Sequence, residues 1–491
     1  MATAFTRTKS SKDQLEKTAL ERLIWEGTRT MRQYALGGNG SKTINAVDRG
    51  NTTSFQNLQN QYPNDGSWCL VPIEPEEDPK DYVSRIFRSY NTNYFKKAIV
   101  ADSGKVFSDG IKIEDTQDAV KESIENFFED VDREGTDAVV YFSNIFQGAE
   151  REGVVGTLVQ FFDPGNSQTL AEQQASGARP YLTEIKIEDL LGWSIINGEL
   201  DSIRVQFVRT MTIDFEEKEE MIVAEIKRNQ INIYTKDNDI TPIETAPNTL
   251  GVVPLVECNF NSEGFFKAAS PYANLADKNL ELFNSSSDQS NILHYARVPL
   301  MHIARSDKDE EANVRIAGNA IIETELDGTV AWVELQGKSI EEGQKDLDRI
   351  KSEINDIGLE LINSENRPDT ATGEIIDANE NNAALESLVP LMQDHIKNVI
   401  QLVQQLNSES GEFKIVLNND FSPGSGGKDA ENVRALADKG HISSKAATES
   451  PSIERLLPEN YDHDTDQAQL DKEATDRNRR FADTTAPGTE P

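Results

Sequence analysis

The segment "KNLELFNSSSDQSNILHYARVP", residues 278–299, decides how the fold of this chain is interpreted. It has the length of a helix and apolar residues at both ends, yet its middle, "NSSSDQSN" at 284–291, is polar throughout. A helix packed in a core carries an apolar stripe, so eight consecutive polar residues do not suit a hydrophobic interior. The segment therefore predicts a helix that lies against hydrated surroundings in its middle. The residues expected outside any hydrophobic core are Ser285, Ser286, Ser287, Asp288 and Ser290.

A small β module is expected directly after this helix. Ser270 and Pro271 suit the helix start, because Ser is a favoured N-cap and Pro is tolerated in the first turn, and the helix is expected to end near 297–299. Three short strands follow in the pattern: "LMHIAR", "NAIIETEL" and "TVAWVEL". Asp327 and Gly328 form a strong hairpin-turn signal between the last two.

Two further helices are predicted beyond this module. The second helix of the set begins at Ser339, with Glu342 three residues later as in a capping box. Residues 363–373 interrupt the pattern, and a third helix runs from 374 to 406, where Pro390 is expected to bend it by removing one backbone hydrogen bond. The second helix has a narrow apolar seam suited to neighbouring helices: Leu347, Ile350, Ile354, Ile357 and Leu361.

The rest of the chain mixes both kinds of structure. Residues 82–162 read as mainly helical and end in the strand-like "VVGTLVQFF", whereas 181–260 read as predominantly β. A strand, "EFKIVLNNDF", and a short helix near 430–439 follow the third long helix, and the tail after 460 is polar and expected to be disordered at its end. The fold class is therefore α+β, rich in helix with small β modules.

Charge limits the possible partners. The 491 residues carry a formal net charge of −36, which opposes tight wrapping of nucleic acid but permits a polyanion to pass closely without sticking. Residues 1–60 differ, because nine Lys/Arg against five Asp/Glu give them a net charge of +4. They are interpreted as a basic N-terminal arm, either a solvated tail or an arm that binds a partner or nucleic acid.

Composition also limits the compartment. Cys69 and Cys258 are the only cysteines and lie far apart in the sequence, which excludes a disulfide framework and a zinc site. The first residues lack the apolar core of a signal peptide, and no apolar run approaches about 18 residues. We expect a soluble product made in the cytoplasm, without membrane contact.

Known catalytic and metal motifs are absent. "SPGSGGKD" at 422–429 looks like a phosphate loop, but Ser422 replaces its first glycine and Asp429 stands where Ser or Thr should bind magnesium. "YDHDTDQ" at 461–467 lacks the Gly and the distal Glu of a calcium loop. His395 has the setting of a packed residue, and the other histidines show no ligand spacing. We expect no catalytic residue, no cofactor, no metal and no enzymatic activity.

The middle of the chain nevertheless has a distinctive order. A polar-centred helix leads out to a β module, a helix with a narrow seam returns, and a long helix follows a polar break. Two such helices suit a stalk that packs against copies of itself around an axis, with polar faces lining a hydrated lumen.

Four blocks in this order resemble portal proteins of tailed bacteriophages. They are "DYVSRIFRSYNTNYFKKAIVADSGKVF", "NLADKNLELFNSSSDQSNILHYARVPLMHIA", "TATGEIIDANENNAALESLVPLMQDHIKNVIQLV" and "VLNNDF". The blocks span about residues 80–440. Their joint order carries the resemblance, since no single block is as diagnostic as a zinc motif. Residues 1–75 and the tail after about 450 are not covered by it.

The resemblance implies the portal architecture of wing, stem, clip and small helical crown. Its parts would be an N-terminal extension at 1–75, wing at 76–269, stem helix at 270–297, clip at 298–338, returning stem helix at 339–362, tunnel loop at 363–373, long wing helix and strand at 374–426, crown at 427–459 and a flexible tail at 460–491. The clip turn would be Asp327 and Gly328. The tunnel loop would project toward DNA, and its residues would be Ser364, Glu365, Asn366, Arg367 and Asp369. Arg367 would contact phosphates transiently, unless it is simply an exposed loop residue.

The resemblance also implies a role. Portal proteins form a homo-oligomeric ring, usually of twelve subunits, at one capsid vertex of the virion, and double-stranded DNA passes through it without sequence specificity during packaging and ejection. The implied partners are further copies of the chain, the major capsid protein, the terminase large subunit and then a head–tail adaptor. Two alternatives stay open: another connector or scaffold component of a virion, and a metal-dependent nuclease with scattered carboxylates.

Overall fold

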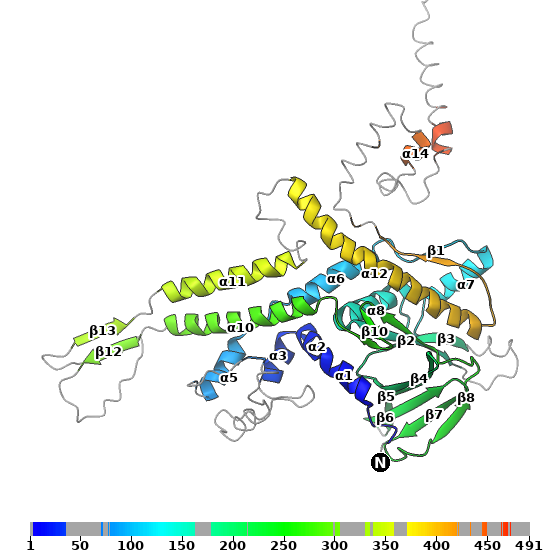
Figure 1. The fold of residues 1–491 in the computed structure, drawn as a ribbon, viewed down its shortest axis with the longest axis horizontal. Helices are drawn as coiled ribbons and strands as arrows, with labels where there is room; N and C mark the ends of the chain where they lie inside the picture. The colour runs from blue at the N-terminus through cyan, green and yellow to red at the C-terminus, as the bar shows by residue number, and fades with distance from the viewer. Residues whose placement is uncertain are drawn as a thin grey trace, which may run out of the picture. The chain divides into compact units, whose positions relative to one another are not determined.

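The computed structural model describes residues 3–35, 70–71, 77, 79–162, 178–213, 215–297, 300–304, 329–333, 337–357, 371–419, 421, 433, 444–448, 463, 465–469 and 472. The chain divides into two compact units. The first comprises residues 1–368 and 383–419, and the second comprises 369–382 and 420–491. Nearly all described elements belong to the first unit, which holds both the main sheets and the paired helices (Figure 1).

Two antiparallel sheets share one hydrophobic core. The larger is a meander in the order β4-β5-β6-β7-β8, and the smaller has the order β3-β2-β9. Buried side chains from both, such as Leu158, Val205 and Leu255, pack in one cluster with Phe266. The strands of the two sheets are β2 (Val154–Phe162), β3 (Arg179–Ile185), β4 (Leu190–Ile196), β5 (Glu199–Ile213), β6 (Glu216–Lys227), β7 (Gln230–Thr235), β8 (Glu244–Pro247) and β9 (Leu255–Asn259). The β-rich segment predicted over 181–260 is confirmed, as is the strand over "VVGTLVQFF".

Helices cover the smaller sheet. One helix on this sheet is α12 (Ala371–Leu406), through the segment that belongs to the first unit. Its His395 lies 3.0 Å from the Thr157 hydroxyl of β2, and its Met392 contacts Cys258 of β9. His395 is buried, as expected, and burial lowers its pKa to about 4. Three further helices come between residue 94 and the start of β2: α6 (Tyr94–Val106), α7 (Asp118–Phe128) and α8 (Ala138–Glu152). In the described residues, most helices and the strands of the two main sheets occupy separate stretches of the chain, in agreement with the α+β fold class.

The N-terminal segment is part of the folded body. It forms α1 (Lys9–Lys17), α2 (Ala19–Glu26) and α3 (Thr28–Ala35). Arg7 donates to the backbone carbonyls of Ile187 and Leu190 over 2.7 and 2.9 Å, and Ile24 and Met31 are fully buried. The interpretation of the N-terminus as a solvated tail is therefore wrong for residues 3–35. Arg7 is a hydrogen-bond donor at the start of the larger sheet, and Arg32 donates to the carbonyl of Ser89 over 2.7 Å.

The three helices of the central segment lie close to the predicted borders. They are α10 (Ala273–Ala296), α11 (Lys338–Asp356) and α12, which continues through Pro390 without a break. The hydroxyl of Ser270 accepts from the amide of Tyr272 over 3.0 Å, as expected of a helix start. The capping box at Ser339 is wrong, because α11 begins one residue earlier with Gly337 as N-cap and without a side-chain cap.

The β module between α10 and α11 is described in part. β12 (Leu300–Ala304) pairs antiparallel with β13 (Thr329–Val333), from Leu300 opposite Val333 to Ala304 opposite Thr329. The strand "NAIIETEL" and the turn at Asp327 and Gly328 lie outside the described residues. β12 starts four residues after α10 ends, and β13 ends five residues before α11 begins. The strand pair therefore follows the C-terminus of α10 and precedes the N-terminus of α11.

The remaining elements are short. β1 (Lys112–Glu114) pairs with β14 (Lys414–Val416), and β10 (Ser262–Gly264) pairs with β11 (Lys267–Ala268). In the second unit, α14 (Ser444–Thr448) lies within the segment expected to form the crown, whereas the helix expected at 430–439 falls almost wholly outside the described residues. Within the described part of the chain, no helix is both long and apolar enough to cross a membrane.

Candidate functional site

The candidate site is the helix pair formed by α10 and α11. Four polar contacts cross between the helices, and as they advance along α10 they retreat along α11, so the helices are antiparallel. In that order they join Lys278 to Glu353, Glu281 to Arg349, Ser285 to Asp346 and the Gln289 amide to the carbonyl of Ile340, over 2.5, 3.0, 2.8 and 2.9 Å. At about 1.5 Å per residue, the 24 residues of α10 extend over about 36 Å.

Charges at one end of the helix pair are mutually compensated. Hydrogen bonds from Lys278 and Arg349 lower the pKa of Glu281 and of Glu353. The same contacts raise the pKa of Arg349. Since these side chains are 31–48% exposed to solvent, each contact contributes little to stability and weakens with salt. Their main effect is on register, because they set which residues of the two helices lie opposite each other.

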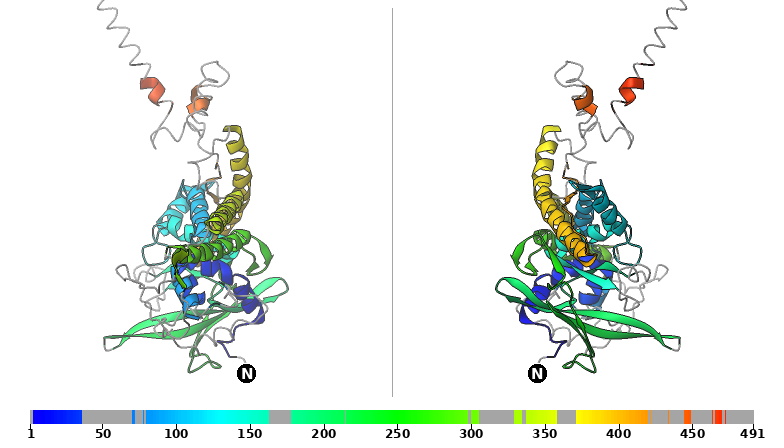
Figure 2. Two further views of the ribbon diagram at one scale, coloured as in Figure 1. Left: turned by 90° about the vertical axis from the view of Figure 1, so that its left-hand side faces the viewer. Right: turned by 90° about the vertical axis from the view of Figure 1, so that its right-hand side faces the viewer.

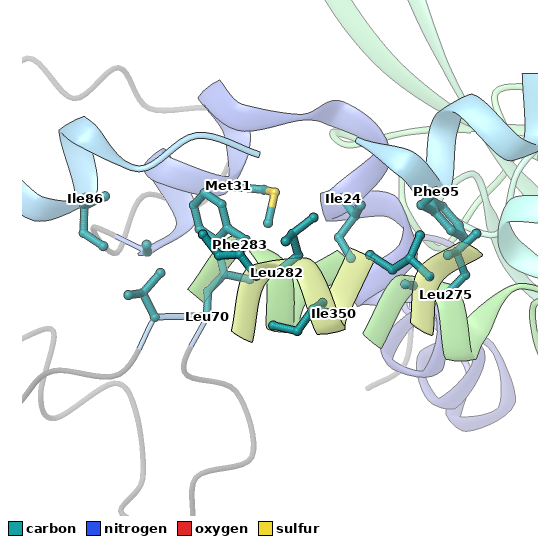
Figure 3. Packing of buried hydrophobic residues seen from close by; sticks show 14 of the residues in the cluster. Ile24, Met31, Leu70, Ile86, Phe95, Leu275, Leu282, Phe283 and Ile350 are labelled. Carbon is teal, nitrogen blue, oxygen red and sulfur yellow. The ribbon is translucent and has the colours of Figure 1, made fainter. Parts of the chain in front are cut away.

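An apolar seam joins the helix pair to the rest of the unit. Leu347, Ile350 and Ile354 of α11 are buried, as the predicted seam requires, while Ile357 is partly exposed and Leu361 lies outside the described residues. The seam belongs to a cluster with residues of α2, α3, α6 and α5 (Pro79–Arg88). Figure 3 shows the side chains that close this cluster, among them Leu275, Leu282, Phe283, Ile350, Ile24 and Met31.

The polar stretch of α10 meets polar groups of α5 and the residues after it. The Ser89 hydroxyl donates to the Ser287 hydroxyl over 2.7 Å, and both side chains are buried. The Ser286 hydroxyl contacts the carbonyl of Tyr90. The expectation that this stretch lies outside the packed interior is therefore wrong for Ser287, because a polar partner from the same chain meets it there. Asp288 is exposed, and the half-buried residues are Ser285, Ser286 and Ser290.

A buried arginine fixes α5 against α10. Arg85 is 2% exposed, and its guanidinium contacts the Glu77 carboxylate at 2.6 and 2.7 Å and Asp288 at 3.1 Å. One turn later, Arg88 donates to the Asn291 amide oxygen over 2.7 Å. A buried guanidinium requires such partners, because an unpaired buried charge is strongly unfavourable. The polar middle of α10 is thus the surface that receives two arginines.

Close approach of the two helices requires a glycine. A Cβ atom on Gly343 of α11 would lie 2.0 Å from the side-chain oxygen of Gln289 on α10. Gln289 is itself buried and held by the carbonyl of Ile340. Gly343 therefore permits the helices to approach at the level where the polar stretch ends.

Sequence reasoning missed a buried carboxyl cluster at the start of α10. The Ser270 hydroxyl donates to the carbonyl of Glu150 over 2.7 Å, and the Tyr272 hydroxyl contacts Asp102. Glu150 is fully buried, and neither carboxyl oxygen has a hydrogen-bond partner. Burial, and then the charge of Asp102, raise its pKa well above the ordinary value. The local sequence "AEREG" carries no sign of this, since acidic residues are common throughout the chain.

A second carboxyl on α2 has a similar environment. Glu21 is buried, and one of its oxygens has no hydrogen-bond partner. Burial raises its pKa to about 7, and the charges of Asp277 on α10 and Glu152 on α8 act in the same direction. The beginning of α10 is thus surrounded by carboxyl groups that favour the neutral form.

Several predicted residues cannot be placed. The clip-turn residues Asp327 and Gly328 lie outside the described residues. So do the tunnel-loop residues, which are Ser364, Glu365, Asn366, Arg367 and Asp369. No group of three or more His, Cys, Asp or Glu residues in the described ranges is arranged to hold a metal ion. The described stem residues lie together on α10 and α11, on the faces given above.

Comparison with known proteins gives a limited match. Residues 271–406, which span α10 to α12, match the family model described as a domain of unknown function, DUF4055. No curated protein matches the chain.

Solved structures resemble the chain only distantly. The chain is similar to one in the neck of an empty gene transfer agent particle computed with C6 symmetry (12% identity, 77% of this chain and 94% of that chain, TM-score 0.41). A second is in the neck of the native particle computed with C12 symmetry (12% identity, 76% of this chain and 94% of that chain, TM-score 0.39). A third is in the virion of the native gene transfer agent particle (13% identity, 71% of this chain and 84% of that chain, TM-score 0.38). Likeness at this level carries no functional conclusion, which has to come from the residues themselves.

Proposed function

We propose that the chain is the portal subunit of a tailed-phage-like particle, a structural component that assembles as a ring and conducts double-stranded DNA. The observation that carries the proposal is the antiparallel pair of helices α10 and α11, with the β12–β13 strand pair inserted between the end of α10 and the beginning of α11. In a ring, the helix pair would be the stem and the strand pair the clip. This is the order of elements that the resemblance to portal proteins implies.

The surface charge of the helix pair supports a channel role. α10 and α11 together contain nine acidic and five basic residues, a net charge of −4. Copies arranged around an axis would line it with a negative field, which repels phosphates at short range and lets the duplex slide. The five-stranded and three-stranded sheets would then belong to the outer mass of the ring.

The clip and the tunnel loop complete the proposal. The β12–β13 pair would dock the terminase that drives packaging and later a head–tail adaptor, and the chain itself would have no enzymatic role. Arg367 in the tunnel loop would contact DNA phosphates transiently. Replacing Arg367 by Ala should then reduce the salt dependence of DNA retention in filled particles, whereas Arg367→Lys should leave that salt dependence unchanged. The same salt dependence in the parent and both variants would show that Arg367 does not contact DNA in the channel.

Imaging tests the assembly itself. The purified full chain, viewed by negative-stain electron microscopy, should show rings with roughly twelvefold symmetry and a central hole. A chain that stays monomeric at micromolar concentration, or that forms closed particles without a hole, would contradict the proposal. Native mass spectrometry of the same sample supplies the copy number independently.

A further inference from the structure

The two longest strands of the larger sheet extend past their neighbours. β4 pairs with β5 only as far as Val205, and β7 pairs with β6 only as far as Ile222. Beyond these points, 208–213 pair only with 216–221. We call residues 208–221 the β5–β6 ribbon; Figure 2 shows it in green, reaching out past the other strands. Such a two-stranded segment gains little stability from the sheet behind it.

The tip of the ribbon carries an aromatic residue where turn chemistry disfavours one. Ile213 pairs with Glu216, so the turn consists of two residues, and Phe215 has a φ of 67° and a fully exposed side chain. Two-residue hairpin turns favour Gly, Asn or Asp at positive φ, because a Cβ atom is strained there. Neither the turn nor the core of the described chain therefore explains a phenylalanine at this position.

The surroundings of Phe215 are acidic. The ribbon contains five acidic and two basic residues, a net charge of −3, and Glu217 and Glu219 are exposed. Arg209, one of the two basic residues, lies 4.0 Å from Glu220. A complementary surface would be an apolar pocket with Lys and Arg at its rim. Nucleic acid does not fit this description, because its phosphates repel the acidic ribbon. A second copy does not supply such a rim at the pocket beside Tyr181, because Asp132, Glu134 and Glu184 line that pocket.

We propose that the tip of the β5–β6 ribbon docks a different protein by inserting Phe215 into an apolar pocket rimmed by basic residues. Exposed aromatic side chains that become buried on binding are frequent centres of interface energy. Addition of a strand along the ribbon fits less well, because charged side chains on both strands oppose edge pairing. The proposal does not depend on ring assembly, since the ribbon belongs to the sheet and not to the helix pair.

Photo-crosslinking in the cells that naturally make the protein tests this directly. The probe is p-benzoylphenylalanine, placed at Phe215 or, as matched control, at Ile240, an exposed apolar residue between β7 and β8. The position 215 probe should join a different protein, in a segment that combines apolar residues with Lys or Arg, and the position 240 probe should not. A crosslink to a second copy, the same product from both positions, or no product would overturn the proposal.

Variants then separate docking from folding, using the crosslinked protein in purified form as the probe. Phe215→Gly should reduce its binding at least tenfold without lowering the thermal midpoint, since glycine relieves the positive φ, whereas Phe215→Trp should retain binding. Glu217→Gln with Glu219→Gln should weaken binding and reduce its dependence on salt. Full binding by Phe215→Gly would overturn the role of the ring.

Discussion

The Ser89 hydroxyl lies 2.7 Å from the Ser287 hydroxyl, and both side chains are buried between α5 and α10. We predict that Ser287→Ala lowers the free energy of unfolding by about 1 kcal/mol, because a buried hydroxyl loses its partner. Ser287→Leu should lower it by about 1–3 kcal/mol through overpacking. Urea unfolding measures both. Ser290→Ala is the control, and an equal loss there would show that the Ser89 contact is not the cause.

Arg85 should contribute far more than its exposed partner. Arg85→Ala leaves the carboxylate of Glu77 buried and without its guanidinium, and we expect a loss of about 3–5 kcal/mol. Asp288→Ala removes a side chain that is 58% exposed, so its loss should stay below about 1 kcal/mol. Denaturant unfolding of the two variants at equal salt tests the difference. Similar losses would mean that the outer ion pair, not the buried one, anchors α5.

Gly343 offers a test of helix approach by non-additivity. In an exposed helix, Gly→Ala gains about 1 kcal/mol, but at Gly343 the new Cβ atom would collide with Gln289. We therefore expect Gly343→Ala alone to be destabilising. In the presence of Gln289→Ala the same change should be stabilising, and a double-mutant cycle measures the coupling. Additive effects would indicate that the Gln289 side chain simply moves aside.

Buried carboxyls at the start of α10 predict a decline in stability with rising pH. The pKa of Glu150 lies above its unfolded value of 4.5, so the unfolded state releases the proton first. Stability then falls by about 1.4 kcal/mol per pH unit between the two pKa values. Groups that face Glu150 or its neighbours are Asp102 and Lys105 of α6, Glu257 and Cys258 of β9, and Tyr272.

Glutamine variants separate the two carboxyls. Glu150→Gln should be more stable than the parent at pH 8, with the advantage vanishing near pH 4. The advantage of Glu21→Gln should level off above about pH 7, where its pKa lies, at a gain of at most about 3–4 kcal/mol. The free energy of unfolding is measured by chemical denaturation from about pH 4 to 8. Glu122→Gln is the control, because it removes the same charge from an exposed position. Parallel curves for all three variants would contradict the prediction.

Periodic patterns in the sequence were sufficient for most elements. The strand over "VVGTLVQFF", the seam at Leu347, Ile350 and Ile354, and the limits of α10 follow from spacing and cap residues, which depend only on local sequence. The α+β class follows from the same patterns. The residues assigned to the tunnel loop and clip turn stay predictions, because they lie outside the described residues.

Partners distant in sequence could not be predicted. Ser287 is buried because Ser89, almost 200 positions earlier, supplies a hydroxyl, and nothing near Ser287 reveals that contact. The basic N-terminus was misread for the same reason, since Arg7 donates to carbonyls about 180 residues away. Likewise, Glu150 differs from exposed glutamates only through the elements packed around it. A single sequence records residue types but not which distant groups satisfy them.

The register of the helix pair makes sliding between the two helices discontinuous. A shift of one turn in one direction would set Lys278 opposite Arg349, and the reverse shift would set Glu281 opposite Glu353, so both displaced states place like charges together. Sliding of one helix past the other is therefore opposed in both directions, and most strongly at low salt. A displacement applied where β12 begins and β13 ends would then be carried along the registered pair toward Ser270 and Tyr272, at the start of α10.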